Sequence, residues 1–412
     1  MANVSSSNGL EKRPKLRFPG FDEPWNTALL SDYFVKSTKK NSDGMISNVI
    51  CNSAKQGLIP QREYFDKDIA NSDNTNGYYI IESNDFVYNP RKSADAPYGP
   101  ISSYQYPEAG IVSPLYLCFR AKREINPLYF EWYFRSSAWH RYIYMSGDSG
   151  ARHDRVSIKD DVFFAMPINV PSAKEQERIS LFLDAIERRI ETQRTLVETL
   201  KKYKRGVISV LLSSRNNPYY SSVTWKEVAL CDVASGFEYG MNAAATVYDG
   251  SHKYIRITDI DDNSHLYSQN VPVSPEGQVD EKYRVRENDI LFARTGASVG
   301  KSYRYQRSDG DLYYAGFLIR IHVNSDVNCG YVFQNTLTEA YRRWVLLESA
   351  RSGQPGINAE QYKQYRFLLP PLELQNKIST LATNLDNLIC KEENLLSQIE
   401  QVKIALLQRL FI

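Results

Sequence analysis

The glycine-rich stretch at residues 293–302, ARTGASVGKS, has the residue types of a nucleotide-binding phosphate loop. Such a loop needs the spacing G-x-x-x-x-G-K-[ST], because successive backbone N–H groups must wrap the phosphates. Only three residues separate Gly296 from Gly300, and Ser302 leads into a β-like segment and not into a helix. The spacing therefore predicts a turn and argues against an ATP site of this kind. The turn presents side chains that can donate hydrogen bonds to phosphates and base edges, namely Arg294, Thr295, Ser298 and Lys301.

Other catalytic patterns also fail on residue type or spacing. Residues 88–91, YNPR, lack the second proline and the aromatic residue of an adenine methyltransferase motif, and residues 280–282, DEK, lack the partners of a nuclease metal site. The five cysteines and five histidines are scattered, with no C-x-x-C or H-E-x-x-H pair. The sequence therefore contains no persuasive catalytic or metal-binding group, and its cysteines are typical of reduced thiols in a cytosolic protein.

Composition limits the possible partners. The net charge is only +2, so an anionic partner must be met by local clusters of Lys and Arg. The 29 tyrosines suit sheet surfaces and wet interfaces, including those that line nucleic acid. No apolar run is long enough to span a bilayer, so we expect a cytoplasmic protein without a membrane partner.

The chain repeats itself with a period of about 200 residues, which bears on fold before any single motif does. From residue 171 onward the first half aligns without a gap with the segment from residue 370 to the C-terminus. Matched pairs include Pro171 with Pro370, Gln176 with Gln375, Ile179 with Ile378, and Trp25 with Trp225. The pattern predicts two similar halves in tandem.

Each half ends in a segment typical of a long helix, in which apolar residues recur at alternating steps of three and four. Roughly 40 residues at about 1.5 Å each give a rod on the order of 60 Å. Ser172 and Glu175 fit a capping box at the first start, and Pro371 suits the first turn of the second. One such helix alone would indicate ordinary core packing, but two matched helices favour packing on each other. The predicted seams contain Ile179, Phe182, Ile186, Ile190, Gln193, Val197, Leu200 and Val207, and Ile378, Leu381, Leu385, Leu388, Glu392, Leu395, Ile399, Val402 and Leu406.

The regions before these helices contain short β segments mixed with helical pieces, without the strict alternation of a parallel sheet. The predicted class is α+β. The predicted organisation is a disordered tail at 1–14, a first domain at 15–171, a helix at 172–213, a linker and second domain at 214–370, and a second helix at 371–412.

Several stretches together resemble a known family. They are PKLRFPGFDEPW at 14–25, NDILFARTGASVGK at 288–301, SGQPGIN at 352–358 leading into LLPPL at 368–372, and the two helix starts with proline and glutamine. In order and spacing the chain resembles the specificity subunit of type I restriction-modification enzymes. It departs from the family's usual P-P-L-x-E-Q at 171–176, PSAKEQ, and at Leu374, where glutamate is usual. These departures put in doubt a specific role for that glutamate.

The resemblance implies two target-recognition domains that alternate with two long helices, paired as an antiparallel coiled coil in a pseudo-twofold repeat. Proteins of this family bind double-stranded DNA with a split target, each domain recognising one half-site while the helices set the spacing. Methylation and cleavage would belong to the partner methyltransferase (modification) and restriction subunits. S-adenosylmethionine, ATP and Mg would be bound by those partners, and this chain would need no cofactor.

The first domain lacks an RTGASVGK sequence, and residues 85–92, DFVYNPRK, are expected to take its place. The two domains should therefore recognise different bases. For any single position the alternative is a solvated turn residue without a DNA role. The expected DNA contacts are Arg91, Lys92, Arg294, Thr295, Ser298, Lys301 and Gln354.

Three other functions are weighed against this one. A specificity subunit of another restriction type would be distinguished by neighbouring genes. A coiled-coil scaffold that binds proteins would show no sequence-selective DNA binding. An ATPase built on residues 293–302 would bind ATP as an isolated chain.

Overall fold

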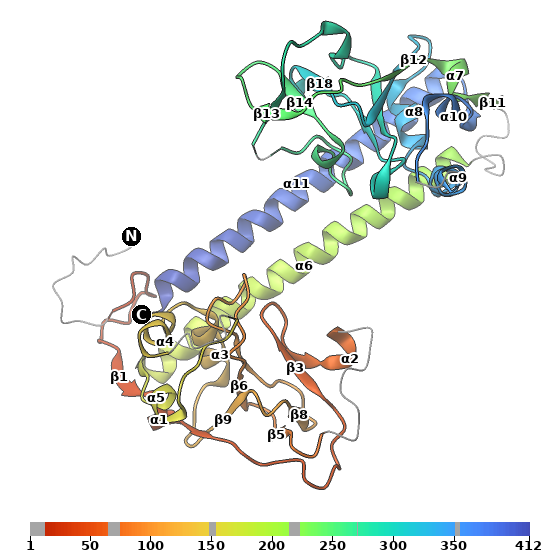
Figure 1. Cartoon of the computed structure of the whole chain (residues 1–412). Coiled ribbons are helices and arrows are strands. Elements are labelled where there is room, and N and C mark those ends of the chain that lie inside the picture. Colours follow the sequence, from red (N-terminus) through yellow and green to blue (C-terminus); the bar gives the residue numbers. More distant parts are fainter. Residues whose placement is uncertain (1–12, 65–74, 148–153, 214–222, 270, 351–354) are drawn as a thin grey trace. The chain divides into compact units, whose positions relative to one another are not determined.

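The structure is a computed structural model that describes residues 13–64, 75–147, 154–213, 223–269, 271–350 and 355–412. These residues form two compact units. Unit 1 comprises residues 1–193 and 395–412, and unit 2 comprises residues 194–394. The predicted disordered tail falls mostly on residues 1–12, outside the described residues. Each unit therefore combines one β-rich domain with one end of each long helix (Figure 1).

Unit 1 is built on an antiparallel four-stranded sheet in the order β2-β9-β6-β7, with β1 paired to β10 and smaller pairs β3-β4 and β5-β8. Phe34 lies at the centre of its core, with ring centroids of Phe86, Phe119 and Phe130 at 5.3, 5.3 and 5.0 Å. The strands are β1 Asn26–Leu29, β2 Phe34–Lys36, β3 Ile50–Ser53, β4 Gly57–Pro60, β5 Tyr79–Ile81, β6 Phe86–Tyr88, β7 Ile101–Ser103, β8 Gly110–Val112, β9 Leu117–Ala121 and β10 Pro167–Val170. The short helices are α1 Leu30–Tyr33, α2 Gln61–Tyr64, α3 Pro127–Arg135, α4 His140–Ser146 and α5 Asp160–Phe164.

Unit 2 has a central antiparallel sheet in the order β12-β19-β16-β17, with β11 paired to β20, β13 to β15 and, in parallel, β14 to β18. Its strands are β11 Lys226–Ala229, β12 Ala234–Tyr239, β13 Ala245–Val247, β14 Lys253–Ile255, β15 Val273–Pro275, β16 Asp289–Ala293, β17 Ser302–Arg304, β18 Leu312–Tyr314, β19 Leu318–Val323 and β20 Arg366–Leu369. Its short helices are α7 Leu230–Val233, α8 Cys329–Asn335, α9 Glu339–Ser349 and α10 Ala359–Lys363, with 3₁₀ turns η4 Ile257–Asp259, η5 Glu281–Tyr283, η6 Gly296–Ser298 and η7 Arg307–Asp309. The mixed α+β class is confirmed.

The central strand begins with the same local turn in both units. Asn84 and Asn288 have φ of 69° and 68°, a left-handed conformation that asparagine tolerates better than most residues. The aspartate that follows each accepts a hydrogen bond from the backbone N–H three residues earlier, at 2.8 Å for Asp85 and 2.7 Å for Asp289. Asn-Asp thus directs the chain into β6 in unit 1 and into β16 in unit 2.

Many of the tyrosines are core residues. Several of these bury the ring and donate a hydrogen bond from the hydroxyl to a backbone carbonyl, as from Tyr129 to Asn169 O at 3.4 Å and from Tyr331 to Leu368 O at 2.6 Å. A buried phenol needs such a partner, because an unmade hydrogen bond costs free energy. The expectation that the tyrosines line a wet interface is wrong for those that are fully buried. These are Tyr88, Tyr104, Tyr129, Tyr133, Tyr254, Tyr303, Tyr314, Tyr331 and Tyr362.

The long helices are α6 Ala173–Leu212 and α11 Leu372–Leu410. The recurrent glutamine has a structural role at each start. The amide of Gln176 donates to Pro171 O at 3.0 Å, and that of Gln375 donates to Pro370 O at 2.8 Å. Each bond ties the first turn of the helix to the end of the preceding strand. Within the described residues, no helix has the length and apolar character needed to cross a membrane.

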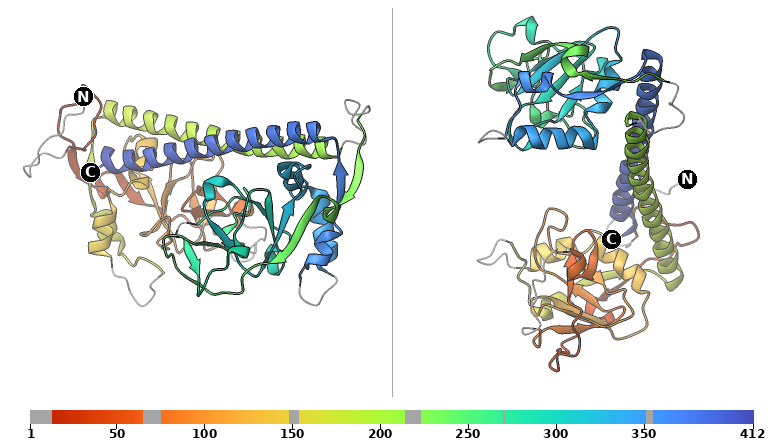
Figure 2. Two further views of the ribbon diagram at one scale, coloured as in Figure 1. Left: turned by 90° about the horizontal axis from the view of Figure 1, so that it is seen from above. Right: turned by 90° about the vertical axis from the view of Figure 1, so that its right-hand side faces the viewer.

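Segments of α6 and α11 lie side by side within each unit (Figure 1 and Figure 2). In unit 2, Lys201 pairs with Glu393 at 2.9 Å and Lys204 with Asp386 at 2.5 Å, so α11 runs in the opposite direction to α6. In unit 1, Lys403 pairs with Glu187 at 2.8 Å.

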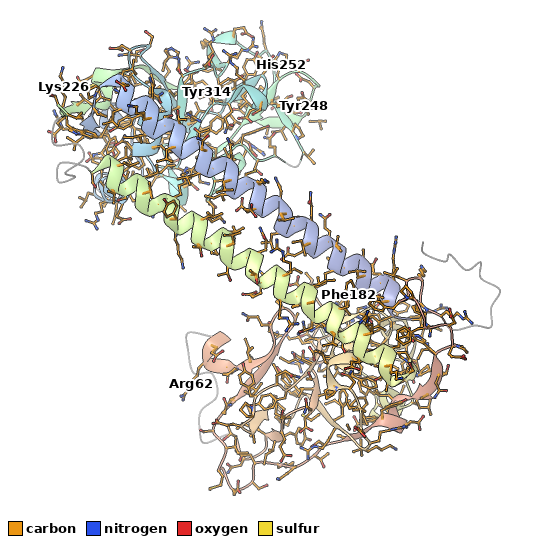
Figure 3. The ribbon with its side chains drawn as sticks, turned by 180° about the vertical axis from the view of Figure 1, so that it is seen from behind. Arg62, Phe182, Lys226, Tyr248, His252 and Tyr314 are labelled. Atoms are coloured by element: carbon orange, nitrogen blue, oxygen red, sulfur yellow. The ribbon has the colours of Figure 1, made fainter. Side chains whose placement is uncertain are left out.

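The buried helix face departs from the predicted seam at Phe182 in α6 and at alternate positions in the first half of α11. In unit 1, Leu183 is fully buried, whereas Phe182, labelled in Figure 3, is 37% exposed. The same shift by one residue in unit 2 buries Ala382 and Ile389 and exposes Leu381 and Leu388. Steps of four then three fit a heptad as well as steps of three then four, and residues 181–183 are all apolar. Periodicity alone could not choose between these faces.

The predicted capping box at the start of α6 forms only in part. The Glu175 N–H donates to Ser172 Oγ at 3.4 Å, but the Glu175 carboxylate accepts two hydrogen bonds from Arg17, at 2.7 and 2.8 Å. Glu175 is 1% exposed and Arg17 14%. The equivalent of Glu175 in unit 2 is Leu374. The glutamate therefore anchors the N-terminal segment to α6 in unit 1 only.

Glu175→Leu would leave the Arg17 guanidinium buried without its carboxylate. Since breaking a buried ion pair is strongly destabilising, we expect a loss of about 3 kcal/mol in the free energy of unfolding of unit 1. This loss of stability is measured by urea titration, followed through hydrogen exchange of the β1 and β10 amides. Arg17→Met combined with Glu175→Leu removes both charges and should restore most of the loss. A double variant no more stable than the single one would contradict this origin.

Candidate nucleic-acid interface

The turn at residues 294–301 connects β16 to β17, which pair antiparallel, and contains the 3₁₀ turn η6. Ser302 is the first residue of β17 and not of a helix. The prediction of a turn in place of a phosphate loop is confirmed.

Two buried tyrosines hold the ends of this turn. Tyr362 from α10 donates to Ala293 O at 2.8 Å, and Tyr341 from α9 donates to Gly300 O at 2.9 Å. Gly300 has φ of +85°, and a Cβ there would lie 2.6 Å from Val345. The second glycine of the motif is therefore required by close packing against α9.

Arg294 lies at the rim of this turn with its guanidinium over an aromatic ring. Its Cζ is 4.8 Å from the centre of the Tyr239 ring, at the end of β12. Its Nε is buried and has no hydrogen-bond acceptor, and the described residues offer its guanidinium no carboxylate within ion-pair distance. A stacked arginine is held in a limited set of orientations and keeps donors for an incoming acceptor. Arg294 is thus held against Tyr239 with donors available, and its DNA contact stays a prediction.

Thr295 lies opposite Gly356 in an antiparallel bridge, and the Gly296 N–H donates to Pro355 O at 3.3 Å. Two motifs that are far apart in sequence, RTGASVGK and the segment after SGQ, are therefore side by side. Ser298 is half-buried within η6. Gln354 lies outside the described residues, immediately before the bridged segment.

Lys301 differs from the other residues expected to contact DNA, because its side chain is only 11% exposed. Its ammonium forms an ion pair with Asp262 and donates to Ile260 O at 3.0 Å. These contacts connect the hairpin to the loop after β14. To reach DNA, Lys301 would have to break them, so the geometry favours a bracing role, and its DNA contact stays a prediction.

In unit 1, the segment at residues 90–92 occupies the place that residues 294–296 have in unit 2. The Lys92 N–H donates to Asp154 O at 2.8 Å, the Val156 N–H donates to Pro90 O at 2.9 Å, and Arg91 lies opposite Arg155. Unit 2 has the same arrangement, with Gly296 donating to Pro355 O and the Ile357 N–H donating to Arg294 O at 2.9 Å. Arg91 and Lys92 therefore correspond in position to Thr295 and Gly296.

Sequence reasoning missed Tyr239 and Arg155. Neither belongs to the motif that it faces, and both are brought there by strand pairing between distant segments. Their sequence neighbourhoods contain no spacing rule that would indicate this. Among the described residues, no group of three or more His, Cys, Asp or Glu could hold a metal ion.

His265 supports the far end of the hairpin. It has φ of +57°, and its Nδ1 lies 2.8 Å from Ser302 O, a distance that suits an N–H donor. Burial lowers the pKa of His265, and the positive charges of Lys301, Arg342 and Lys204 lower it further, against the hydrogen bond to Ser302. The neutral imidazole is the form that the folded protein accommodates.

A group whose pKa is lower in the folded than in the unfolded state makes stability fall as the pH falls, because the unfolded chain binds more protons. We therefore expect the melting temperature of unit 2 to decrease more between about pH 7.5 and about pH 5.5 in the wild type than in His265→Asn. Asparagine tolerates the left-handed backbone and can donate to Ser302 O. Parallel pH profiles for the two proteins, measured by calorimetry, would contradict this role.

Three comparisons with known proteins all find proteins of type I restriction systems. Residues 222–401 match the family described as Type I restriction modification DNA specificity domain. The Type I restriction enzyme StySPI specificity subunit of Salmonella potsdam is 23% identical over 311 residues, which cover 71% of this chain and 66%, slightly less than two thirds, of that protein.

Two solved structures share the fold. The S subunit of a type I restriction-modification system from M. genitalium aligns with a TM-score of 0.58 and 13% identity, over 97% of this chain and 99% of its own. A chain from a study of complex assembly and conformational transition of the type I R-M system aligns with a TM-score of 0.57 and 14% identity, over 95% and 98%. Residues 222–401 therefore match the DNA specificity domain of type I restriction-modification systems, and the whole chain shares the fold of the two solved structures.

Proposed function

We propose that this chain is the DNA sequence-recognition subunit of a type I restriction-modification complex, and that it recognises a target in two parts. The observation that carries the proposal is the recurrence of one backbone arrangement in both units with different side chains on it. At the three corresponding positions unit 1 has Pro90, Arg91 and Lys92, and unit 2 has Arg294, Thr295 and Gly296. A shared frame with different donors suits the recognition of two different half-sites.

In this proposal the chain carries no catalytic residue and no cofactor of its own. Methyltransferase and restriction subunits would supply S-adenosylmethionine, ATP and Mg, and the complex would act on double-stranded DNA in the cytoplasm. Exposed apolar side chains on the long helices, such as Leu388 at 40% and Val402 at 53%, are candidates for contact with the modification subunits.

The rival with some support is a coiled-coil scaffold, because exposed apolar residues on paired helices also suit protein partners. The stacked Arg294 favours DNA instead, because a guanidinium held over a ring without a carboxylate partner can donate to a phosphate or a base edge. A specificity subunit of another restriction type would use the same contacts and would differ only in its partners.

The function is tested by mapping methylated adenines in DNA from cells that carry the gene and from cells in which it is deleted. We expect one split motif to lose its methylation on deletion and regain it on complementation. Identical methylation maps in cells with active modification subunits would sink the proposal.

Arg294→Ala should weaken target binding by about 1–3 kcal/mol, because one arginine contact to a base edge or phosphate is lost. Lys301→Ala should instead lower the melting temperature of unit 2, since its ammonium is engaged with Asp262 and Ile260. Binding is measured by fluorescence anisotropy with a target duplex. Arg307→Ala is the matched control, because Arg307 is 80% exposed and pairs with Glu287. Unchanged affinity in Arg294→Ala would contradict the placement.

A further inference from the structure

Unit 1 places two arginines directly opposite each other at the corner equivalent to the Arg294 turn. Arg91 and Arg155 form an antiparallel bridge, and the flanking hydrogen bonds run from Lys92 N to Asp154 O and from Val156 N to Pro90 O. Neither arginine exchanges a backbone bond with the other, so theirs is a non-hydrogen-bonded pair. In such pairs the Cα atoms are roughly 4.5 Å apart and the side chains leave on the same face.

Two like charges in this position are unfavourable in the free protein. Among the described residues, Asp154 is the carboxylate that both guanidinium groups approach, with Nε to Oδ2 distances of 3.9 Å for Arg91 and 3.7 Å for Arg155. Asp154 is 50% exposed, so its attraction is screened by water. One partly solvated carboxylate does not balance two arginines and the neighbouring Lys92.

The fold does not require these charges. Unit 2 makes the same bridge with Thr295 opposite Gly356 and forms equivalent backbone hydrogen bonds. The arginine pair is therefore an addition of unit 1 to a backbone frame that is stable without it. Arg91 is 68% exposed and Arg155 32%, so both can be reached by a ligand.

We infer that Arg91 and Arg155 together bind one phosphate of the DNA backbone, which makes Arg155 a DNA-binding residue of unit 1. The inference rests on the proposed function. Two guanidinium groups on one face offer several N–H donors to the oxygens of a single phosphate, and the bound anion removes their mutual repulsion. This contact orients unit 1 on the duplex and carries no base preference of its own.

The test compares Arg91→Gln, Arg155→Gln and the double variant of the full-length chain, with DNA affinity measured between about 50 and 200 mM salt. Each single variant should bind the target and an unrelated duplex about fivefold to tenfold more weakly. The double variant should reduce the slope of log affinity against log salt by about 0.9, the value for one phosphate. A reduction by about 1.8 would indicate two phosphates and overturn the shared site. Weakening confined to the target would indicate a base contact and also overturn it.

Arg188→Gln is the control for the change in net charge, because Arg188 lies on α6 in unit 1 and pairs with Asp184 at 3.1 Å. It should leave affinity and salt slope as in the wild type. The melting temperature of Arg155→Gln should be no lower than that of the wild type, since a repulsive pair is removed. A lower melting temperature with unchanged DNA binding would assign Arg155 a purely structural role.

Asp154→Asn provides a test of opposite sign. Without its carboxylate the arginine pair should repel more strongly, so the melting temperature should fall while affinity for DNA rises. Added inorganic phosphate should stabilise the wild type more than Arg155→Gln at equal ionic strength, because the same two guanidinium groups can bind it, and equal stabilisation of the two proteins would count against a shared phosphate site. If the wild type binds DNA and Arg155→Gln matches it in affinity and in the salt dependence of that affinity, the inference about Arg155 fails while the proposed function stands. If the wild type shows no sequence-selective binding, the proposed function fails as well.

Discussion

The candidate interface in each unit depends on a short antiparallel bridge between two distant parts of the chain. One side is the end of the central strand, at residues 90–92 or 294–296, and the other is the segment at 154–156 or 355–357. These contacts use backbone N–H and C=O groups, so they place few demands on the side chains. The frame can therefore remain while the residues that face a ligand change.

The two units use this freedom differently. Unit 2 holds one arginine against the Tyr239 ring, while unit 1 sets Arg91 opposite Arg155. The aspartate at the start of the central strand also keeps its place while its side-chain partner changes, since Asp85 contacts Arg120 at 2.6 Å and Asp289 contacts His322 at 2.8 Å. Such differences on one frame are what recognition of two unlike half-sites requires.

Buried tyrosines explain how short, irregular segments form firm supports for these turns. The rings of Tyr341 and Tyr362 fill core volume, and their hydroxyls donate to carbonyls at the two ends of the turn, at Gly300 and Ala293 respectively. Glycine at position 300 then lets α9 pack closely against the hairpin. The residues that look like a phosphate loop are therefore explained by hairpin packing.

The sequence by itself determined the features that depend on local spacing. The repeat, the long helices, and the turn in place of a phosphate loop follow from which residues recur and at what intervals. Only the tertiary structure decided which apolar face of α6 and α11 is buried, because Phe182 and Leu183 are equally apolar neighbours. It also decided that Lys301 turns inward to Asp262, and that Tyr239 and Arg155 face turns far from them in sequence. Contacts between distant segments are set by strand pairing and packing of the whole unit, and local sequence carries no record of them.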